Sequence, residues 1–336
     1  MVGFFVSELF CTWAVMRFRA CRSPWPFGSC MKSFSRIILS PQQQQVFDQL
    51  IPIARMVTSG RMANLPFKTR AHSLIIAPSG SGKSHVARLL GAELDLPTLV
   101  INVSSWVVLS ARNEPWTMSL ICEWLNGLCG GGILVLDEVD KLGGSLFSGT
   151  GNGEWSRMIL IELLDLLDGI IPLATRLPEL PEECWNPKPG YTLRETLSRL
   201  LGQRVFILAC GAWQQAWRDN GRHLGFGADA APASQHPNSD QILRSMVPEF
   251  RQRFRNEVCW LSPMVQADYL EISDRVASQL QDPALLRSWK KLALPMIDDA
   301  AAAGHGMRVF EEIMLAALLD SQECDTRPQI NTVALV

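Results

Sequence analysis

A loop between a predicted strand and a predicted helix constrains the fold of this chain more than any other segment. The loop has the sequence APSGSGKS from Ala77 to Ser84, and the apolar run Ser73–Ile76 precedes it. Helical periodicity follows from Ser84 to Leu90. The loop fits the pattern GxxxxGK[ST], except that alanine stands at the first glycine. Gly80 and Gly82 carry no side chain that would block an anion from the inward-facing backbone N–H groups, so the segment predicts a phosphate-binding loop.

The loop residues are the expected contacts of a nucleoside triphosphate. Lys83 would reach the β- and γ-phosphates, and the hydroxyl of Ser84 would hold Mg²⁺. The N-terminus of the following helix adds partial positive charge beneath the anion. The expected cofactors are therefore ATP and Mg²⁺. The expected nucleotide contacts in this segment are Pro78, Ser79, Gly80, Ser81, Gly82, Lys83, Ser84 and His85.

Two acidic residues after a second apolar run complete the expected chemistry. Asp137 and Glu138 follow Ile133–Leu136, which is typical of a strand buried on both faces of a parallel sheet. Ligands of open α/β sheets bind at the carboxyl ends of the strands. Asp137 is the candidate Mg²⁺ residue, and Glu138 is the candidate that polarises the attacking water. A solvated turn that happens to contain two acids is the alternative.

Composition sets limits on partners and location. A length of 336 residues allows two or three domains, and 47% hydrophobic residues suffice for a packed core. The net charge of -2 gives no basic field for nucleic acid. The nine cysteines form no CxxC pair, so neither a zinc site nor a disulfide framework is indicated. They resemble the reduced thiols of a cytoplasmic protein.

The first part of the chain differs from the rest. Residues 1–18 are apolar but too short to span a bilayer, and their arginines follow the apolar run instead of preceding it, unlike a secretory signal. No membrane association is expected. Because Met31 opens a more ordinary sequence, we expect residues 1–34 to be a disordered extension or to lie upstream of the true start.

Strand and helix signals alternate through the larger part of the chain, which predicts an α/β fold with a parallel sheet flanked by helices. A helix is expected over Pro41–Ile53, with Ser40 as its cap. Beyond Pro263 only helical patterns remain. The expected domains are a large α/β nucleotide-binding domain over 35–262, a small helical lid over 263–322 and a tail over 323–336. The expected strands are Leu74–Ile76, Thr98–Val103, Ile133–Leu136, Val205–Ala209 and Val258–Leu261, and the expected lid helices are Ala267–Leu280, Pro283–Ala300 and Gly306–Asp320.

These motifs together resemble an AAA+ ATPase of the clade that contains the ClpX and HslU unfoldases. Besides the phosphate loop, the chain carries LVLDEVDKL over Leu134–Leu142. Val247–Phe254 is similar to the PEFxGR box of that clade, and Gly304–Arg308 is similar to its GARGLR sensor-2 box. The resemblance covers roughly residues 36 to 322 in order and spacing.

The resemblance implies roles for three further residues. Arg253 would be the arginine finger that reaches the γ-phosphate bound by a neighbouring subunit, so the active form would be a homo-oligomeric ring, by resemblance a hexamer. Arg308 would contact the nucleotide from the lid of the same subunit. Ile38 occupies the place of the adenine-packing segment. Surface charge without a role is the alternative for both arginines.

The predicted sensor-1 strand departs from many AAA+ proteins. It ends in Cys210-Gly211-Ala212-Trp213, without the asparagine that often follows such a strand. A thiol is only a weak donor, so Cys210 could orient a water only weakly. We favour the interpretation of Cys210 as a small buried residue.

Two loops bear on the expected protein substrate. The tripeptide Leu224, Gly225 and Phe226 is similar to the loop with which ClpX docks on a ClpP-like peptidase, although a glycine-rich turn with a buried phenylalanine is the alternative. The GYVG pore loop of the clade is missing. Trp106 could grip polypeptide in its place, or could belong to the core. A second pore loop is expected at Gly143–Gly153.

Two functions remain open at this point. The chain is expected to be a ring ATPase that remodels or unfolds a protein substrate, with possible transfer to a peptidase. The alternative is a nucleotide-gated switch or scaffold in the assembly of protein or nucleic-acid complexes, for example in a mobile element or in phage defence. The sequence does not identify the client.

Overall fold

The fold is described from a computed structural model of the chain. It covers the following residues: 38–65, 71–110, 116–142, 153–177, 191–219, 237, 242, 246–255, 257–303 and 305–326.

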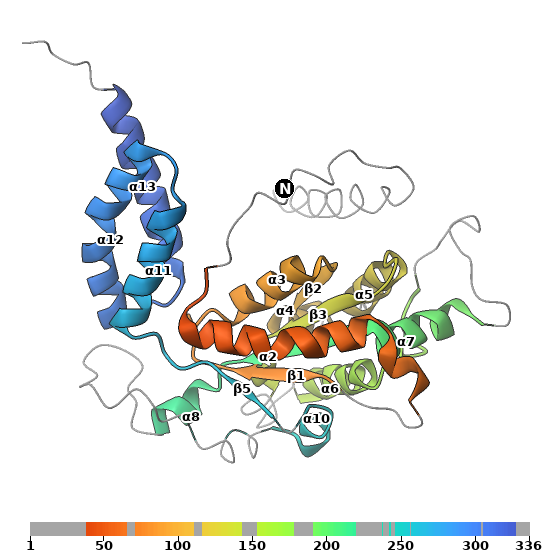
Figure 1. The fold of residues 1–336 in the computed structure, drawn as a ribbon. Coiled ribbons are helices and arrows are strands. Elements are labelled where there is room, and N and C mark those ends of the chain that lie inside the picture. Colours follow the sequence, from red (N-terminus) through yellow and green to blue (C-terminus); the bar gives the residue numbers. More distant parts are fainter. Residues whose placement is uncertain are drawn as a thin grey trace, which may run out of the picture. The chain divides into compact units, whose positions relative to one another are not determined.

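Five parallel strands form one sheet in the order β2-β3-β4-β1-β5 (Figure 1). The strand β1 lies between β4 and β5, and Ile75 faces Cys210 on one side and Cys259 on the other. Side chains of β1, β3 and β4 are almost all buried, as expected for a parallel sheet covered on both faces. The predicted α/β fold of the P-loop AAA+ type is confirmed. The strands are β1 Ser73–Ile76, β2 Thr98–Asn102, β3 Gly132–Asp137, β4 Val205–Gly211 and β5 Cys259–Trp260.

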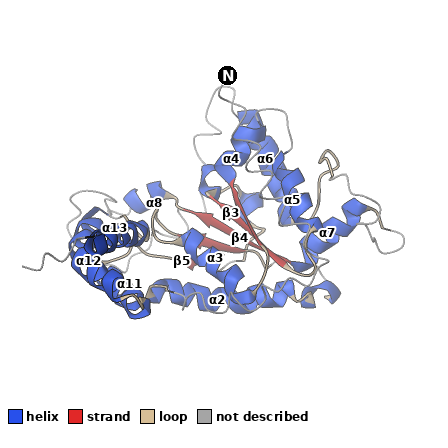
Figure 2. Ribbon diagram, turned by 90° about the horizontal axis from the view of Figure 1, so that it is seen from above, coloured by secondary structure: helices blue, strands red, loops and turns tan. Residues whose placement is uncertain are grey.

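Helices cover the two faces of this sheet. Those that pack on one face are α2 Pro41–Thr58 and α3 Lys83–Leu94, and those on the other are α4 Val103–Ser110, α5 Trp116–Asn126 and α6 Gly153–Leu167 (Figure 2). The connection from β1 to β2 runs along the sheet in the opposite direction to those from β2 to β3 and from β3 to β4. Because such connections are right-handed, α3 lies on one face and α4, α5 and α6 lie on the other. The remaining elements before the C-terminal helices are η2 Arg61–Asn64, η3 Val139–Leu142, α7 Leu193–Arg204, α8 Gln214–Asp219 and α10 Pro248–Arg251.

The first described helix begins where the sequence predicts it. The Ser40 side chain accepts a hydrogen bond from the backbone N–H of Gln43, and the Gln43 side chain accepts one from Ser40 N–H, which completes a capping box. Pro41 occupies the first turn, where its missing N–H costs nothing. The Gln43 side chain also donates to the carbonyl of Ser81 at 2.9 Å, so this helix start supports the phosphate loop.

Three C-terminal helices pack around a core of their own. They are α11 Gln266–Gln279, α12 Pro283–Ala303 and α13 Arg308–Thr326. Tyr269, Trp289 and Ile313 are almost fully buried between them. Ile38 packs against this same core, and Arg275 of α11 donates to the carbonyl of Leu39 at 3.0 Å. The start of the described chain therefore contacts the helical region as well as α2.

Several elements differ by a few residues from the predicted bounds, and two of these differences are the following. Val103, expected at the end of a strand, opens α4 instead, and Ser104 and Trp106 are consequently helical. The last helix continues to Thr326, past the predicted end at Asp320. Both differences concern element ends, which local sequence patterns determine weakly.

Candidate nucleotide-binding site

A cavity of about 920 Å³ opens at the carboxyl edge of the sheet. It lies where the phosphate loop after β1, the acidic pair after β3 and the turn after β4 meet, which is the usual ligand position of open α/β sheets. Residues of α11 and α13 line its other side. Its size is in the range of small-molecule sites. The structure thus brings most of the predicted site residues to one place.

The phosphate loop has two positions that require glycine. Gly80 and Gly82 both have a φ of +85°, a conformation that side chains rarely adopt. A side chain at Gly82 would also collide with that of Gln43. Ala77, at the place of the first glycine of the pattern, is fully buried and donates its N–H to the carbonyl of Gly211 at 3.2 Å. A small side chain is therefore accommodated there.

Lys83 folds over the loop that precedes it. Its ammonium donates to the carbonyls of Ala77 and Pro78, at 2.8 Å and 3.0 Å. Burial lowers the pKa of Lys83 below its ordinary value. The nearby acidic groups raise this pKa, but their effect is smaller than that of burial. An anion in the cavity would offset this loss of hydration.

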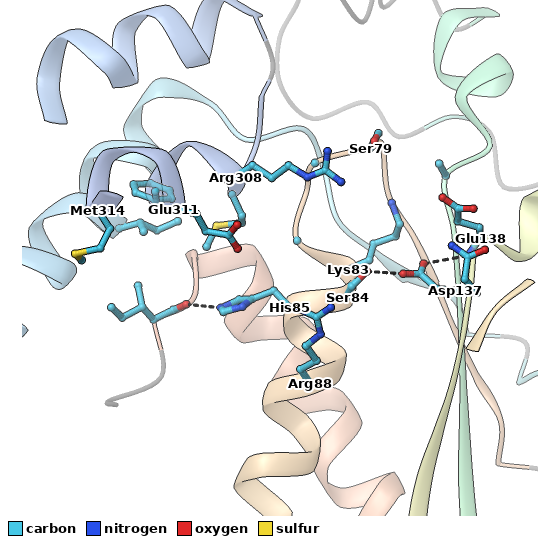
Figure 3. A pocket seen from close by; sticks show the side chains of 18 of the residues that line it. Ser79, Lys83, Ser84, His85, Arg88, Asp137, Glu138, Arg308, Glu311 and Met314 are labelled. Atoms are coloured by element: carbon cyan, nitrogen blue, oxygen red, sulfur yellow. Dashed lines mark hydrogen bonds between the residues drawn. The ribbon is translucent and has the colours of Figure 1, made fainter. Parts of the chain in front are cut away.

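The acidic pair after β3 is held by hydroxyl groups. Ser84 Oγ donates to Asp137 Oδ2 at 2.6 Å (Figure 3). Ser104 Oγ donates to Glu138 Oε2 at 2.7 Å. Glu138 has a φ of +59°, an unusual backbone conformation outside glycine. Its pKa lies below the ordinary value, mainly because of the hydrogen bond from Ser104. Glu138 is therefore a carboxylate at neutral pH.

The turn after β4 is fixed to the same acidic segment. Asp140 accepts the backbone N–H of Ala212 at 3.0 Å, and the indole of Trp217 donates to the carbonyl of Ala212 at 2.9 Å. Cys210 is completely buried in β4, and burial raises the pKa of its thiol. It is the small buried residue that the sequence favoured.

The segment before α13 joins the helical region to the phosphate loop. The backbone N–H of Met307 donates to the carbonyl of Gly80 at 3.0 Å, and Gly306 N–H donates to the Tyr269 hydroxyl at 2.9 Å. Arg308 begins α13 directly afterwards, lines the cavity, and extends toward the loop that carries Ser79 (Figure 3). The predicted sensor-2 residue thus lies at the site.

In the first turn of α3, His85 lies beside Ile38. One ring nitrogen of His85 is 3.2 Å from the carbonyl oxygen of Ile38 (Figure 3). Both residues line the cavity. These two predicted nucleotide contacts are therefore neighbours.

Arg253 does not line this cavity. Its guanidinium contacts Asp168, just beyond the end of α6, at 2.6 Å. The structure thus separates Arg253 from the other predicted catalytic residues, Lys83 and Glu138, within one chain.

The suggestion that Trp106 grips polypeptide is wrong for this structure. The side chain is 1% exposed and its indole donates to Glu162 of α6 at 3.0 Å. Because Ser104 and Trp106 share the short helix α4, the tryptophan turns into the core while the serine faces Glu138. The core alternative holds.

Several predictions fall outside the described residues. These are the docking tripeptide Leu224, Gly225 and Phe226, the extension over 1–34, and the glycine-rich segment up to residue 152. Among the residues that are described, no helix combines the length and apolar character needed to cross a membrane.

Sequence reasoning missed the residues that act through tertiary contacts. Ser104, Gln43 and Asp168 have no motif of their own, and each reaches its partner from a distant part of the chain. Asp140 could have been identified from the sequence, because it lies two residues after Glu138 in the same acidic segment.

A comparison with known families agrees with this geometry. Residues 73–186 match the family model described as "ATPase family associated with various cellular activities (AAA)". The matched segment includes the phosphate loop, the acidic pair and α6. With the sheet order and the helical C-terminal region, this match supports an AAA+ ATPase that binds nucleotide.

Proposed function

We propose that the cavity binds ATP with Mg²⁺ and hydrolyses it in an assembly that remodels a protein substrate. The observation that carries this proposal is the placement of Glu138 beside the Ser84–Asp137 pair, at the mouth of the phosphate loop (Figure 3). Arg308 approaches the same loop from α13. Positive groups for the phosphates and a carboxylate for the water therefore share one cavity.

The reaction is an in-line attack of water on the γ-phosphorus. As the water oxygen forms its bond to phosphorus, the bond to the β–γ bridging oxygen breaks and Glu138 takes the proton of the water. Lys83 and Arg308 neutralise charge on the phosphate oxygens. The Lys83 ammonium has three N–H donors and the Ala77 and Pro78 carbonyls accept two of them, so the third can donate to a phosphate oxygen.

The protein oxygens at this site fit Mg²⁺. Ser84 Oγ and Asp137 Oδ2 are 2.6 Å apart and are both hard oxygen donors. Mg²⁺ commonly takes one or two such protein ligands together with phosphate oxygens and waters. When bound, it would supply charge neutralisation at the β- and γ-phosphates.

Assembly accounts for the separate position of Arg253. In a ring, by resemblance a hexamer, Arg253 would reach the ATP of a neighbouring subunit. Movement of α11–α13 would follow the nucleotide state, because Met307 and Arg308 contact or face the loop that holds it. This motion would act on the protein substrate. Coupling to a ClpP-like peptidase through Leu224, Gly225 and Phe226 stays a prediction.

The substitution Glu138→Gln tests the hydrolytic assignment. The amide cannot accept the proton of the water, so turnover should fall by about 10²–10⁴-fold. Binding of a fluorescent ATP analogue should be retained, since the phosphate contacts are unchanged. Lys83→Ala serves as the matched comparison and should lose binding as well. Turnover of Glu138→Gln at the wild-type rate would refute the assignment.

A second candidate is a nucleotide-gated switch or scaffold, which the burial of Trp106 favours because it removes the proposed grip. A client retained by the Glu138→Gln variant with ATP would separate the two functions. The retained client is then incubated with the wild-type protein and ATP. If the protein remodels the client, the backbone amide hydrogens of the client should exchange faster. If the protein is a switch, it should bind and release the client without changing the rate of amide hydrogen exchange in the client.

A further inference from the structure

The guanidinium of Arg253 is held from two sides by its own subunit. Nε and Nη2 both donate to Asp168 Oδ2, at 3.0 Å and 2.6 Å, and Nη1 donates to the carbonyl of Glu249 at 2.6 Å. The side chain of Arg253 is 18% exposed and that of Asp168 17%. Such a partly buried, charge-assisted contact fixes orientation better than an exposed ion pair does.

These contacts leave part of the guanidinium available. An arginine has five N–H donors, and the hydrogen bonds to Asp168 and Glu249 use three of them. Within the described part of the chain, one N–H on each terminal nitrogen has no acceptor. Two N–H groups on neighbouring nitrogens can bind the oxygens of a phosphate together.

The backbone that carries Arg253 is also anchored. Phe250 and Phe254, on either side of it, are 4% and 7% exposed. Their rings pack edge to face, with the ring centroids 4.9 Å apart. The ring of Phe254 also contacts His72. With the backbone and the guanidinium both fixed, the arginine has little freedom to search for an acceptor.

The surface beside Asp168 has the character of a contact between subunits. Met158 and Ile161 of α6 are 54% and 59% exposed. Helical spacing places them on the face that continues toward Asp168. Ile170, two residues beyond Asp168, is 48% exposed. A second copy of this chain that covers these side chains would lie beside Asp168 and Arg253.

We propose that Asp168 is a positioning residue, which aims Arg253 at the ATP of a neighbouring subunit. The inference rests on the proposed function, in which Arg253 completes the neighbour's site. Asp168 acts only through Arg253. It therefore affects the site to which its own subunit contributes the arginine, and leaves the site of its own subunit intact.

The substitution Asp168→Ala measures this effect. Loss of the carboxylate frees the guanidinium, and the steady-state kcat for ATP should fall about 10–100-fold, as expected for a misplaced catalytic group. Affinity for an ATP analogue should be unchanged. The matched control is Asp165→Asn, which removes a neighbouring carboxylate of α6 and should cause a small fraction of that loss. Circular dichroism on heating checks that each variant is folded.

Mixed assemblies separate a positioning role from a structural one. Glu138→Gln subunits cannot hydrolyse ATP but contribute an intact Arg253, whereas Asp168→Ala subunits have the reverse defect. The ATPase rate of the mixture should exceed the sum of the rates that the two variants show when each is measured alone. Mixing Glu138→Gln with Arg253→Ala subunits tests the role of Arg253 itself in the same way.

The outcomes distinguish the two proposals. In one outcome, Glu138→Gln subunits restore the ATPase rate of Arg253→Ala subunits but not that of Asp168→Ala subunits whose kcat is reduced. This result overturns the role of Asp168 and leaves the role of Arg253 as an arginine finger intact. Rescue of neither overturns the arginine finger together with this inference. An unchanged or increased kcat of Asp168→Ala also overturns it, and an increase would mean that Asp168 restrains Arg253.

Discussion

At the scale of single residues, the contact between Ser104 and Glu138 determines the state of the proposed base. The serine hydroxyl stabilises the carboxylate and is the main reason why its pKa is lowered, while partial burial acts in the opposite direction. A carboxylate must be unprotonated to accept a proton from water. The Ser104 contact therefore extends the pH range in which Glu138 can act.

Removal of this hydroxyl should change the pH dependence of ATP hydrolysis. In Ser104→Ala the pKa of Glu138 rises, because its largest stabilising contact is lost. The decline of kcat on acidification should then begin at a higher pH than in the wild type. Ser105→Ala, which changes the exposed neighbouring serine, is the control. Superimposable pH profiles for wild type and Ser104→Ala would contradict the role given to Ser104.

The chemistry of the site was predictable only where it is local in sequence. Lys83, Ser84 and Asp137 belong to short strings that specify a loop and a strand end, and the structure brings them together. Ser104 carries no such signal, because the strand-like pattern before it continues to Val103 and hides the start of α4. Which face of α4 meets Glu138 is decided by packing.

At the scale of elements, the junction between α12 and α13 is built directly on the phosphate loop. Gly306 has a φ of +64°, and a side chain at this position would run into the backbone of Gly80. The next residue, Met307, donates to the carbonyl of that same glycine. A change in the loop therefore passes to the start of α13 without an intervening side chain.

The substitution Gly306→Ala should weaken this junction. The left-handed backbone alone costs an alanine about 1–2 kcal/mol, and the collision with Gly80 adds to it. The free energy of unfolding in urea should fall by at least that amount, and affinity for an ATP analogue should fall with it. Gly130→Ala, where a methyl group meets open space, should change stability by less than about 0.5 kcal/mol. Equal stability of both variants would contradict the close packing.

The sequence identified the five strands, α2, α3 and the three C-terminal helices, since each carries its own periodicity, but it gave no bounds for α4, α5, α6 and α7. It left Trp106 undecided between a grip and a core residue, because a tryptophan next to a predicted strand end is compatible with both an exposed loop and a buried helix. It also gave no partner for Arg253. Asp168 lies 85 residues earlier in the chain, and only the fold places it within hydrogen-bond distance.

At the scale of the whole molecule, the proposed catalytic groups are divided between two locations. Lys83, Glu138 and Arg308 surround the cavity, whereas Arg253 is fixed beside Asp168 at the end of α6. Under the proposed function, one chain presents a nucleotide site and, separately, an arginine for the site of a neighbouring subunit. Full activity then requires at least two subunits.

The dependence of the ATPase rate on protein concentration tests this requirement most directly. An arginine supplied by a neighbour increases turnover by about 10³–10⁵-fold in related phosphoryl transfers. The rate per subunit should therefore be low in dilute solution and should rise to a plateau as light scattering reports assembly. A rate per subunit that stays constant down to concentrations where the protein is monomeric would contradict the account.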